Sequence, residues 1–159
     1  MQRIEKIVKH PLLIKQMRKN AESETNRTFC KHDLSHALDV ARIAQLMNLE
    51  QSLSLEKELV YAMALLHDIT KWQQYEDGIP HNESAIAPAK EILEDTGFSE
   101  EEIDKITYAI LHHRKGPPDE HPYAKLLFEA DKLARPCFFC DAQADCHRDN
   151  RLKNLTPKH

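Results

Sequence analysis

The strongest constraint on the fold is the stretch VYAMALL at residues 60–66, which is apolar on almost every side of a helix. Ser54 is a candidate N-cap for this helix, and Glu56 and Glu58 fall in its first turn, where the helix dipole favours carboxylates. A helix that is apolar all round has no face for solvent and must be surrounded by other elements. We therefore predict a central, buried helix over 54–71, in a chain whose 159 residues suit one domain.

The rest of the chain predicts further helices around this one. Apolar residues recur at helical spacing in the segments 2–19, 33–49, 82–95, 100–113 and 123–135. Pro88 is placed to distort its helix, Gly97 to end it, and Ser99 with Glu102 to open the next one as a capping box. Few segments alternate with period two and only three glycines occur, so we expect an all-α fold of about six helices.

Charge and hydropathy exclude several classes of partner. The formal net charge of -4 argues against general nucleic-acid binding, which needs a basic surface, although a local basic pocket for one phosphate is compatible with it. No apolar run approaches the roughly 20 residues that cross a bilayer. The N-terminal segment lacks the features of a secretion signal. We expect a cytoplasmic protein without a membrane partner; its oligomeric state is open, a homodimer being one alternative.

His67 and Asp68 stand at the C-terminal end of the segment that should be most buried. Burying an imidazole and a carboxylate is costly unless something pairs them. A divalent cation is a suitable partner, because these ligand types bind ions from Mn and Fe to Zn. A hydrogen-bonded His-Asp pair, or a frayed helix end that faces water, would also account for these two residues alone.

Other imidazoles and carboxylates fall at or near the ends of predicted helices. They are His32, His36, His81, His112, His113 and Asp131. Ten histidines is a high count for this length, and a surplus often reflects metal binding or acid-base work. His32 and His36 are four residues apart, which predicts that they share one helix face. Helix ends cluster at one end of a bundle, so convergence of these groups is a hypothesis, although the spacing alone does not test it.

The order of His36, His67-Asp68 and Asp131 resembles the H…HD…D signature of the HD-domain phosphohydrolase superfamily. Four local blocks also resemble that family's motifs: KHDLSHALDVARIA, LLHDITK, YAILHHRKG and FEADKLAR. The resemblance covers roughly residues 30–136. It implies an HD-domain helical bundle over residues 1–136, and we expect residues 137–159 to form a cysteine-bearing tail packed on it.

The resemblance also implies a metal site. The ligands of a first divalent ion would be His36, His67, Asp68 and Asp131. Branches with two ions add histidines, for which His81 and one of His112 and His113 match, His113 being favoured; Asp68 would then bridge both ions. The alternative is a single ion, with these histidines binding substrate phosphate. Fe, Mn, Mg and Zn are the candidate metals.

The implied chemistry is phosphoryl hydrolysis. A divalent ion lowers the pKa of its water towards about 7, and the resulting hydroxide would attack phosphorus. Asp68 would orient the water, and Lys71, one turn beyond it, would contact phosphate unless it is simply a solvated helix-end cation. His32 would contact substrate or hold a ligand in place. The other cationic candidates for substrate binding are Arg114, Lys115, Lys132 and Arg135.

The four cysteines lie at the edges of this core. Cys137, Cys140 and Cys146 form a C-x2-C-x5-C pattern after the last family block, and Cys30 precedes the first block. A cytoplasmic chain disfavours disulfides. Four thiolates would complete a structural zinc site or bind an iron–sulfur cluster, with His147 as a substitute for one of them. Unligated thiols are the alternative.

The expected substrate is a phosphate ester or anhydride, a nucleotide or a similar small metabolite, since the chain lacks room for a separate specificity domain. Three alternatives stay open at this stage. They are an oxygenase with an iron pair, a nucleotide-sensing module without turnover, and a structural or redox protein built around the cysteines.

Overall fold

The computed structural model describes residues 1–158 and is all-helical over that range, which confirms the predicted fold class. The α-helices are α1 (Gln2–Lys9), α2 (Pro11–Ser23), α3 (Leu34–Glu50), α4 (Lys57–Leu66), α5 (Lys71–Glu76), α6 (His81–Ser84), α7 (Ile86–Thr96), α8 (Glu100–His112) and α9 (Pro122–Leu133). Two short 3₁₀ helices, η1 (Cys137–Phe139) and η2 (Asn150–Leu152), follow in the tail. No helix in residues 1–158 is long and apolar enough to cross a membrane.

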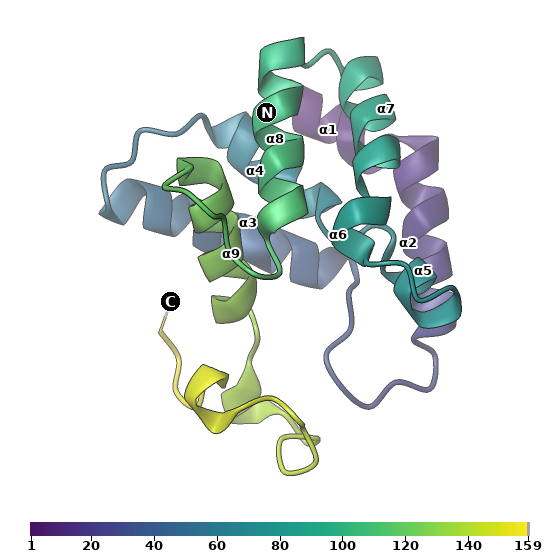
Figure 1. Ribbon diagram of the computed structural model, residues 1–159, viewed down its shortest axis with the longest axis vertical. Coiled ribbons are helices and arrows are strands. Elements are labelled where there is room, and N and C mark those ends of the chain that lie inside the picture. The colour runs from purple at the N-terminus through teal and green to yellow at the C-terminus, as the bar shows by residue number, and fades with distance from the viewer. Residues whose placement is uncertain (159) are drawn as a thin grey trace.

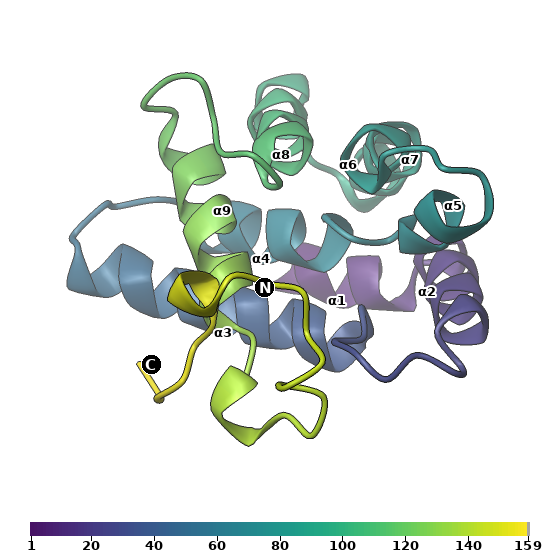
Figure 2. The same ribbon diagram turned by 60° about the horizontal axis from the view of Figure 1, so that its bottom comes forward.

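Helix α4 is the centre of the molecule, as its apolar sequence predicted. Seven of its ten residues are fully buried: Leu59, Val60, Ala62, Met63, Ala64, Leu65 and Leu66. It packs against α3, α8, α9 and α1, and Figure 2 shows it between α3 on one side and α8 on the other. Burial of these side chains, worth about 1.5–3 kcal/mol for each large one, is the main force that assembles the bundle.

The single helix predicted over 2–19 and the predicted start of the central helix are both wrong, each for a local reason. Segment 2–19 is two helices, because Pro11 lacks an N–H and begins a new helix, whose Leu12 N–H donates to Nδ1 of His10. The central helix begins at Lys57, since Ser54 lies in the preceding loop with a φ of +57°. Asn48 holds that loop by bonding both the N–H and the carbonyl of Leu55.

The segment after α4 and the segment around Pro88 also differ from the prediction. Helix α4 ends at Leu66, residues 67–70 form a turn, and Lys71 opens a separate short helix. Pro88 lies in the first turn of α7, where its missing N–H breaks no helical bond, so it does not distort the helix. The break falls instead at Ala85, between α6 and α7.

Two predicted boundary signals are confirmed. Gly97 ends α7 with a φ of +89°, a conformation that glycine adopts without strain. Ser99 and Glu102 form the reciprocal capping box at the start of α8. The Glu102 carboxylate also binds Arg3, which ties α1 to this helix start.

The turn after α4 is held from outside by Asn20 of α2, whose side chain is buried. Its amide nitrogen donates to the carbonyl of Asp68 at 2.8 Å, and its amide oxygen accepts from Trp72 N–H at 2.9 Å. The same nitrogen lies 3.4 Å from the carbonyl of His32. The Asn20 side chain therefore links the loop before α3, the turn after α4 and the start of α5.

The chain after α9 is anchored by Asn154, which is buried against the last turn of that helix. Its amide nitrogen donates to the carbonyls of Lys132, Leu133 and Arg135 at 2.7–3.1 Å, groups that have no partner within the helix. The tail therefore lies at the C-terminal end of α9, at the bottom of Figure 1.

Replacing Asn20 with alanine should lower the free energy of unfolding by about 2–4 kcal/mol, because the Asp68 carbonyl and the Trp72 N–H lose their partner inside the protein. Chemical denaturation measures this. The exposed Asn26 provides the matched control, and its alanine variant should change stability by less than about 0.5 kcal/mol. Equal effects of the two variants would contradict the assignment.

Candidate metal centre

Six side chains from different helices meet at one end of the bundle. They are His36 in the first turn of α3, His67 and Asp68 in the turn after α4, His81 at the start of α6, His113 directly after α8, and Asp131 on α9. The convergence on which the sequence interpretation depended is therefore present in the structure.

The first group of ligand atoms comes from His36, His67, Asp68 and Asp131, and all four atoms lie within 4.8 Å of one another. Nε2 of His36 lies 3.3 Å from Oδ1 of Asp131. Nε2 of His67 lies 3.0 Å from Oδ2 of Asp68 and 3.8 Å from Oδ1 of Asp131. Two imidazoles and two carboxylates at this spacing match a site for a first-row divalent ion.

The second group comes from Asp68, His81 and His113. Oδ1 of Asp68 lies 2.9 Å from Nε2 of His81 and 3.6 Å from Nε2 of His113, and the two imidazole nitrogens are 3.0 Å apart. Since Oδ2 of Asp68 faces the first group and Oδ1 faces the second, this carboxylate is placed to bridge two ions.

The histidine rings are oriented by hydrogen bonds at their outer nitrogens. Nδ1–H of His67 donates to the carbonyl of Ala64 at 2.7 Å, and Nδ1–H of His113 donates to the carbonyl of Ile110 at 2.6 Å. Nδ1 of His81 bonds the side-chain oxygen of Gln74 at 2.6 Å. With the proton on Nδ1, each ring presents the lone pair of Nε2 to the centre, as metal-binding histidines do.

Several buried polar atoms of the centre have no hydrogen-bond partner, which tests whether a cation fits. Nε2 of His36, Nε2 of His67 and Oδ1 of Asp68 are in this state. Leaving such atoms unpaired is costly, whereas divalent ions in the two ligand groups would satisfy all three. The donor set and the unpaired atoms therefore fit a metal.

The electrostatics of the centre also favour positive charge. Burial opposes protonation of His67, but the carboxylates of Asp68 and Asp131 outweigh it and raise its pKa to about 10. Burial likewise opposes ionisation of Asp68 and Asp131, yet the surrounding histidines hold both pKa values well below the usual range. His81 differs, since burial lowers its pKa to about 4 and keeps it neutral, the form that binds metal.

His32 lies beside the centre but not on α3, because Asp33 is the N-cap of that helix. The expectation that it shares a helix face with His36 is therefore wrong. Its Nδ1 bonds the carboxylate of Glu24 at 2.5 Å, and its Nε2 lies 3.9 Å from Oδ2 of Asp68. Glu24 also accepts a bond from Tyr75. No periodicity pointed to Glu24, since it lies just past the end of α2, in a segment that the sequence predicted only as a loop.

The structure distinguishes His112 from His113. His113 belongs to the second ligand group. His112 is the last residue of α8, and its ring packs on Tyr108 with centroids 4.4 Å apart. His112 is absent from both ligand groups found in residues 1–158, so the favoured residue of the pair is the one at the centre.

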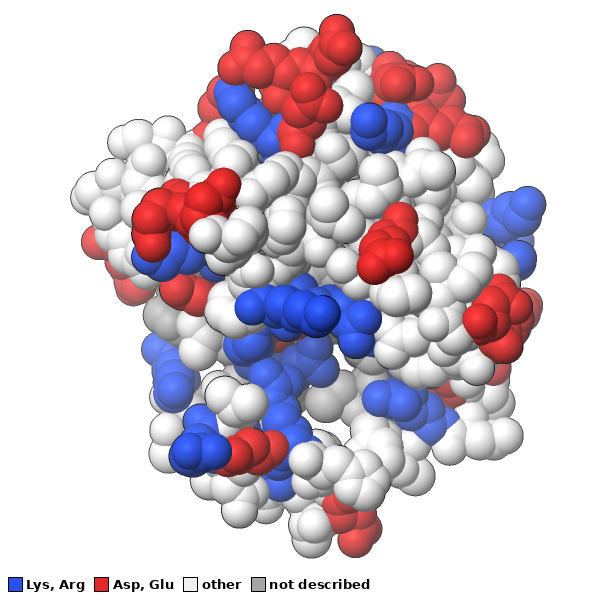
Figure 3. Space-filling model, in the orientation of Figure 1, with Lys and Arg blue, Asp and Glu red and all other residues white. Residues whose placement is uncertain are grey.

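A pocket of about 190 Å³ opens directly above the two ligand groups. Its wall includes Asp68, His81, His113 and Asp131, together with five cationic residues: Lys71, Arg114, Lys132, Arg135 and Arg148. Figure 3 shows Lys and Arg side chains gathered around this hollow in the middle of the face. Lys115, by contrast, does not line it.

The sequence analysis assigned Lys71 to the wrong helix and did not identify Arg148 as a residue of the pocket. Lys71 starts α5 instead of continuing the helix of Asp68, although it still reaches the pocket. Arg148 comes from the tail and was missed, because nothing in the tail's pattern indicated contact with the centre. Burial lowers the pKa of Lys71 and lowers that of Lys132 to about 8, despite the nearby carboxylates.

Arg135 lies between the centre and the tail. One terminal nitrogen of its guanidinium donates to both oxygens of Asp131, at 2.9 and 3.2 Å. Its Nε is buried and has no hydrogen-bond partner. The guanidinium therefore keeps Asp131 ionised and still has donor capacity for an anion.

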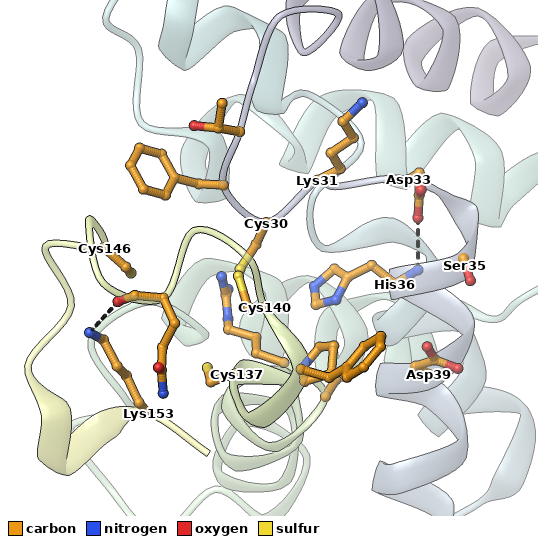
Figure 4. Close-up of a pocket in the computed structure, with 17 residues that line it drawn as sticks. Cys30, Lys31, Asp33, Ser35, His36, Asp39, Cys137, Cys140, Cys146 and Lys153 are labelled. Atoms are coloured by element: carbon orange, nitrogen blue, oxygen red, sulfur yellow. Dashed lines mark hydrogen bonds between the residues drawn. The ribbon is translucent and has the colours of Figure 1, made fainter. Parts of the chain in front are cut away.

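The four cysteines are all unpaired thiols and line a second pocket of about 330 Å³, next to His36 and Arg135. Figure 4 shows the Cys30 side chain directed from the loop before α3 towards the tail, which carries Cys137, Cys140 and Cys146. Over residues 1–158, no group of three or more ligand atoms within 4.8 Å of one another includes a cysteine. His147 is exposed, and its ring lies 6.1 Å from that of Phe29.

The comparisons with known proteins agree with this geometry. The family model for the HD domain matches residues 33–135, which contain all six ligand residues. A protein of Clostridium beijerinckii, described as uncharacterized, is 46% identical over 139 residues, which are 87% of each chain. The crystal structure of a predicted HD superfamily hydrolase from an uncultured Thermotogales bacterium is similar with a TM-score of 0.59 and 27% identity, covering 77% of this chain and 68% of that one. This chain belongs to the HD-domain family.

Proposed function

We propose that this protein is a metal-dependent hydrolase that acts on a phosphate ester or anhydride, with a nucleotide or a similar small phosphorylated metabolite as its substrate. The observation that carries the proposal is the pair of ligand groups that share Asp68 at the base of a pocket with five cationic side chains. The solved relative described as a predicted hydrolase supports the reaction class.

The charge of the pocket favours an anionic substrate. The carboxylates of Asp68 and Asp131 alone would repel an anion, but divalent ions would neutralise them and leave the surrounding cations in excess. Arg135 and Arg114 offer planar guanidinium groups, which bind phosphate oxygens through two parallel N–H donors. The buried, unpaired Nε of Arg135 is a donor for which a phosphoryl oxygen is a suitable acceptor. A neutral ester could accept single hydrogen bonds here but would bring no negative charge to balance these cations.

The chain's own residues have separate tasks in this reaction. A bound divalent ion supplies Lewis acidity, which acidifies water and withdraws charge from phosphoryl oxygens. Asp68 orients the attacking water, because its carboxylate is shared by both ligand groups. Lys71 lies with its Nζ 3.2 Å from Nδ1 of His81 and at the pocket wall, where it contacts the phosphoryl group as a point charge.

The proposal is tested by assaying anaerobically purified protein with Fe, Mn, Mg or Zn against nucleotides, sugar phosphates and carboxylic esters. Release of phosphate or of a nucleoside monophosphate is the expected result. Turnover of carboxylic esters alone would contradict the phosphate assignment. Tight nucleotide binding without turnover under all four metals would indicate a sensor and overturn the enzymatic proposal.

Asp68→Asn should reduce activity more than roughly 100-fold, since even residues that merely support metal ligands cost 10–100-fold when replaced. The variant keeps the shape of the side chain but loses the charge shared by both ligand groups, so metal content should fall as well. Asp104→Asn, an exposed position on α8, is the matched control and should retain both activity and metal. Elemental analysis and the phosphatase assay give the two readings.

His113→Ala and His112→Ala form a second matched pair. The first variant removes one ligand of the second group and should lose about one metal ion per chain and most activity. The second variant removes only a ring that packs on Tyr108, so metal content and kcat should stay within about twofold of the wild type. Loss of metal in His112→Ala alone would reverse the assignment.

Arg148→Ala should raise KM about tenfold, because a hydrogen bond to a charged group contributes roughly 1.5 kcal/mol or more. Arg151→Ala is the control in the same tail, since Arg151 is exposed and pairs with Asp149. Steady-state kinetics on a phosphate substrate checks both. If the two variants had the same KM, Arg148 would have no part in substrate binding.

A further inference from the structure

The reaction proposed above uses none of the four cysteines, although the structure brings them around one pocket. Cys30 lies in the loop before α3, while Cys137, Cys140 and Cys146 lie in the tail, more than 100 residues later. All four are partly buried and line the same space of about 330 Å³ (Figure 4). This arrangement joins two segments that the helices alone do not connect.

One ring contact beside the cysteines joins the loop to the tail, and each of the two segments also has a hydrogen bond of its own. The ring of Phe29, next to Cys30, meets the ring of His147, next to Cys146, at 6.1 Å. Arg27 donates from its Nε to the carbonyl of Cys30 at 2.9 Å. Within the tail, Nζ of Lys153 donates to the carbonyl of Gln143 at 3.0 Å. The backbone on both sides of the pocket is therefore positioned without any covalent link between the cysteines.

We propose that Cys30, Cys137, Cys140 and Cys146 bind a [4Fe–4S] cluster, which fastens the tail to the loop before α3. Four thiolates are the full ligand set of such a cluster, and each binds a different iron atom at its corner. Assembly takes two ferrous ions, two ferric ions and four sulfide ions from the cell, which together make a core of charge 2+, and each thiol releases its proton to solvent as it binds iron. The role of the cluster is structural and involves no electron transfer.

The sulfur atoms are not gathered as the ligands of a single tetrahedral zinc ion would be. Thiolates around one tetrahedral zinc ion lie about 3.8 Å from one another. In the described chain, no three cysteine sulfurs come within 4.8 Å of one another, although all four surround the same pocket. A cluster separates its ligands by the width of its iron–sulfur core, so it suits thiols spread around a space of this size.

The charges around the pocket also suit an anionic cluster. A [4Fe–4S] core with charge 2+ and four thiolate ligands carries a net charge of about −2. Asp33 and Asp39 line the same pocket, but Lys31, Arg135 and Lys153 outnumber them, and each segment that contributes cysteines also contributes one of these cations. These side chains would stabilise the cluster and the thiolate form of its ligands.

The cluster has a consequence for the metal centre. Arg148 is two residues after Cys146 and lines the pocket above Asp68. A cluster bound at Cys146 would therefore hold Arg148 over that pocket, a consequence that rests on the proposed function because it gives Arg148 a substrate to bind. The existence of the cluster does not depend on it.

The test is the iron and acid-labile sulfide content of the wild-type protein, purified anaerobically and examined by visible absorption and Mössbauer spectroscopy. We expect about four sulfide ions per chain and the spectrum of a [4Fe–4S] cluster. Iron at the His/Asp centre brings no sulfide, so the sulfide reading is independent of the proposed hydrolase activity. Zinc bound to the cysteines without sulfide would overturn the cluster, and four freely titratable thiols in the native protein would overturn any metal at this site.

The sulfide content of cysteine variants and of matched controls tests where the cluster binds. The double variant Cys137→Ser, Cys140→Ser should lose the sulfide, whereas Ala144→Ser, in the same tail, and Asp68→Asn, at the other centre, should keep it.

Limited proteolysis provides a second reading that does not require a folded cysteine variant. Wild-type protein from which a chelator and an oxidant have removed the cluster should be cut in residues 137–150 at least tenfold faster, with unchanged helical circular dichroism. An unchanged cleavage rate would contradict the fastening role.

Discussion

The burial of the Asp68 carboxylate is the constraint on which the rest of this structure depends. The residue is 5% exposed, and its two oxygens face the four imidazoles of the ligand groups, one from its neighbour His67 and three from other helices or helix ends. An ionised carboxylate is stable in such a place only if positive charge surrounds it. The histidines can supply that charge as protons, but a divalent ion supplies more of it and also satisfies the nitrogen atoms that lack partners. The bundle is thus arranged so that a cation completes it.

The sequence predicted the parts of this arrangement that repeat along a helix. The apolar stretch of α4 identified the central helix, because a helix that is buried on all sides must be apolar on all sides. The capping residues Gly97 and Ser99 were also predicted correctly, since each depends only on its neighbours in the chain. The six residues that meet at the candidate metal centre were predicted from the order of the family motifs, with His113 favoured over His112. Asn20, Glu24 and Arg148 were missed, because each acts through contacts that follow no helical or strand spacing, and such contacts leave no periodicity. The turn at 67–70 was missed for a related reason: Asn20, which is 48 residues away in the chain, helps to hold it by bonding the Asp68 carbonyl.

Membership of the HD-domain family accounts for residues 33–135, but the charge at the pocket depends on residues on both sides of that boundary. Arg148 comes from outside the matched region, and Arg135 is its last residue. The tail is held at this point by Asn154, which caps the final carbonyls of α9. The helix that supplies Asp131 is therefore the same helix that positions the tail, so the metal centre and the tail share a mechanical support.

Arg135 lies between the metal centre and the pocket lined by the cysteines. Its side chain lines both pockets, with one terminal nitrogen on Asp131 and a buried Nε that has no partner. Burial opposes the charge on this guanidinium, but the carboxylates of Asp131 and Asp68 outweigh it and raise its pKa above the usual range, so it stays protonated under all conditions that preserve the fold. A permanent cation at this position lowers the energy of Asp131 as a carboxylate before any metal binds, and it attracts an anion from either side. Because the charge cannot be removed by titration, Arg135 contributes the same positive charge to both pockets at any pH that preserves the fold.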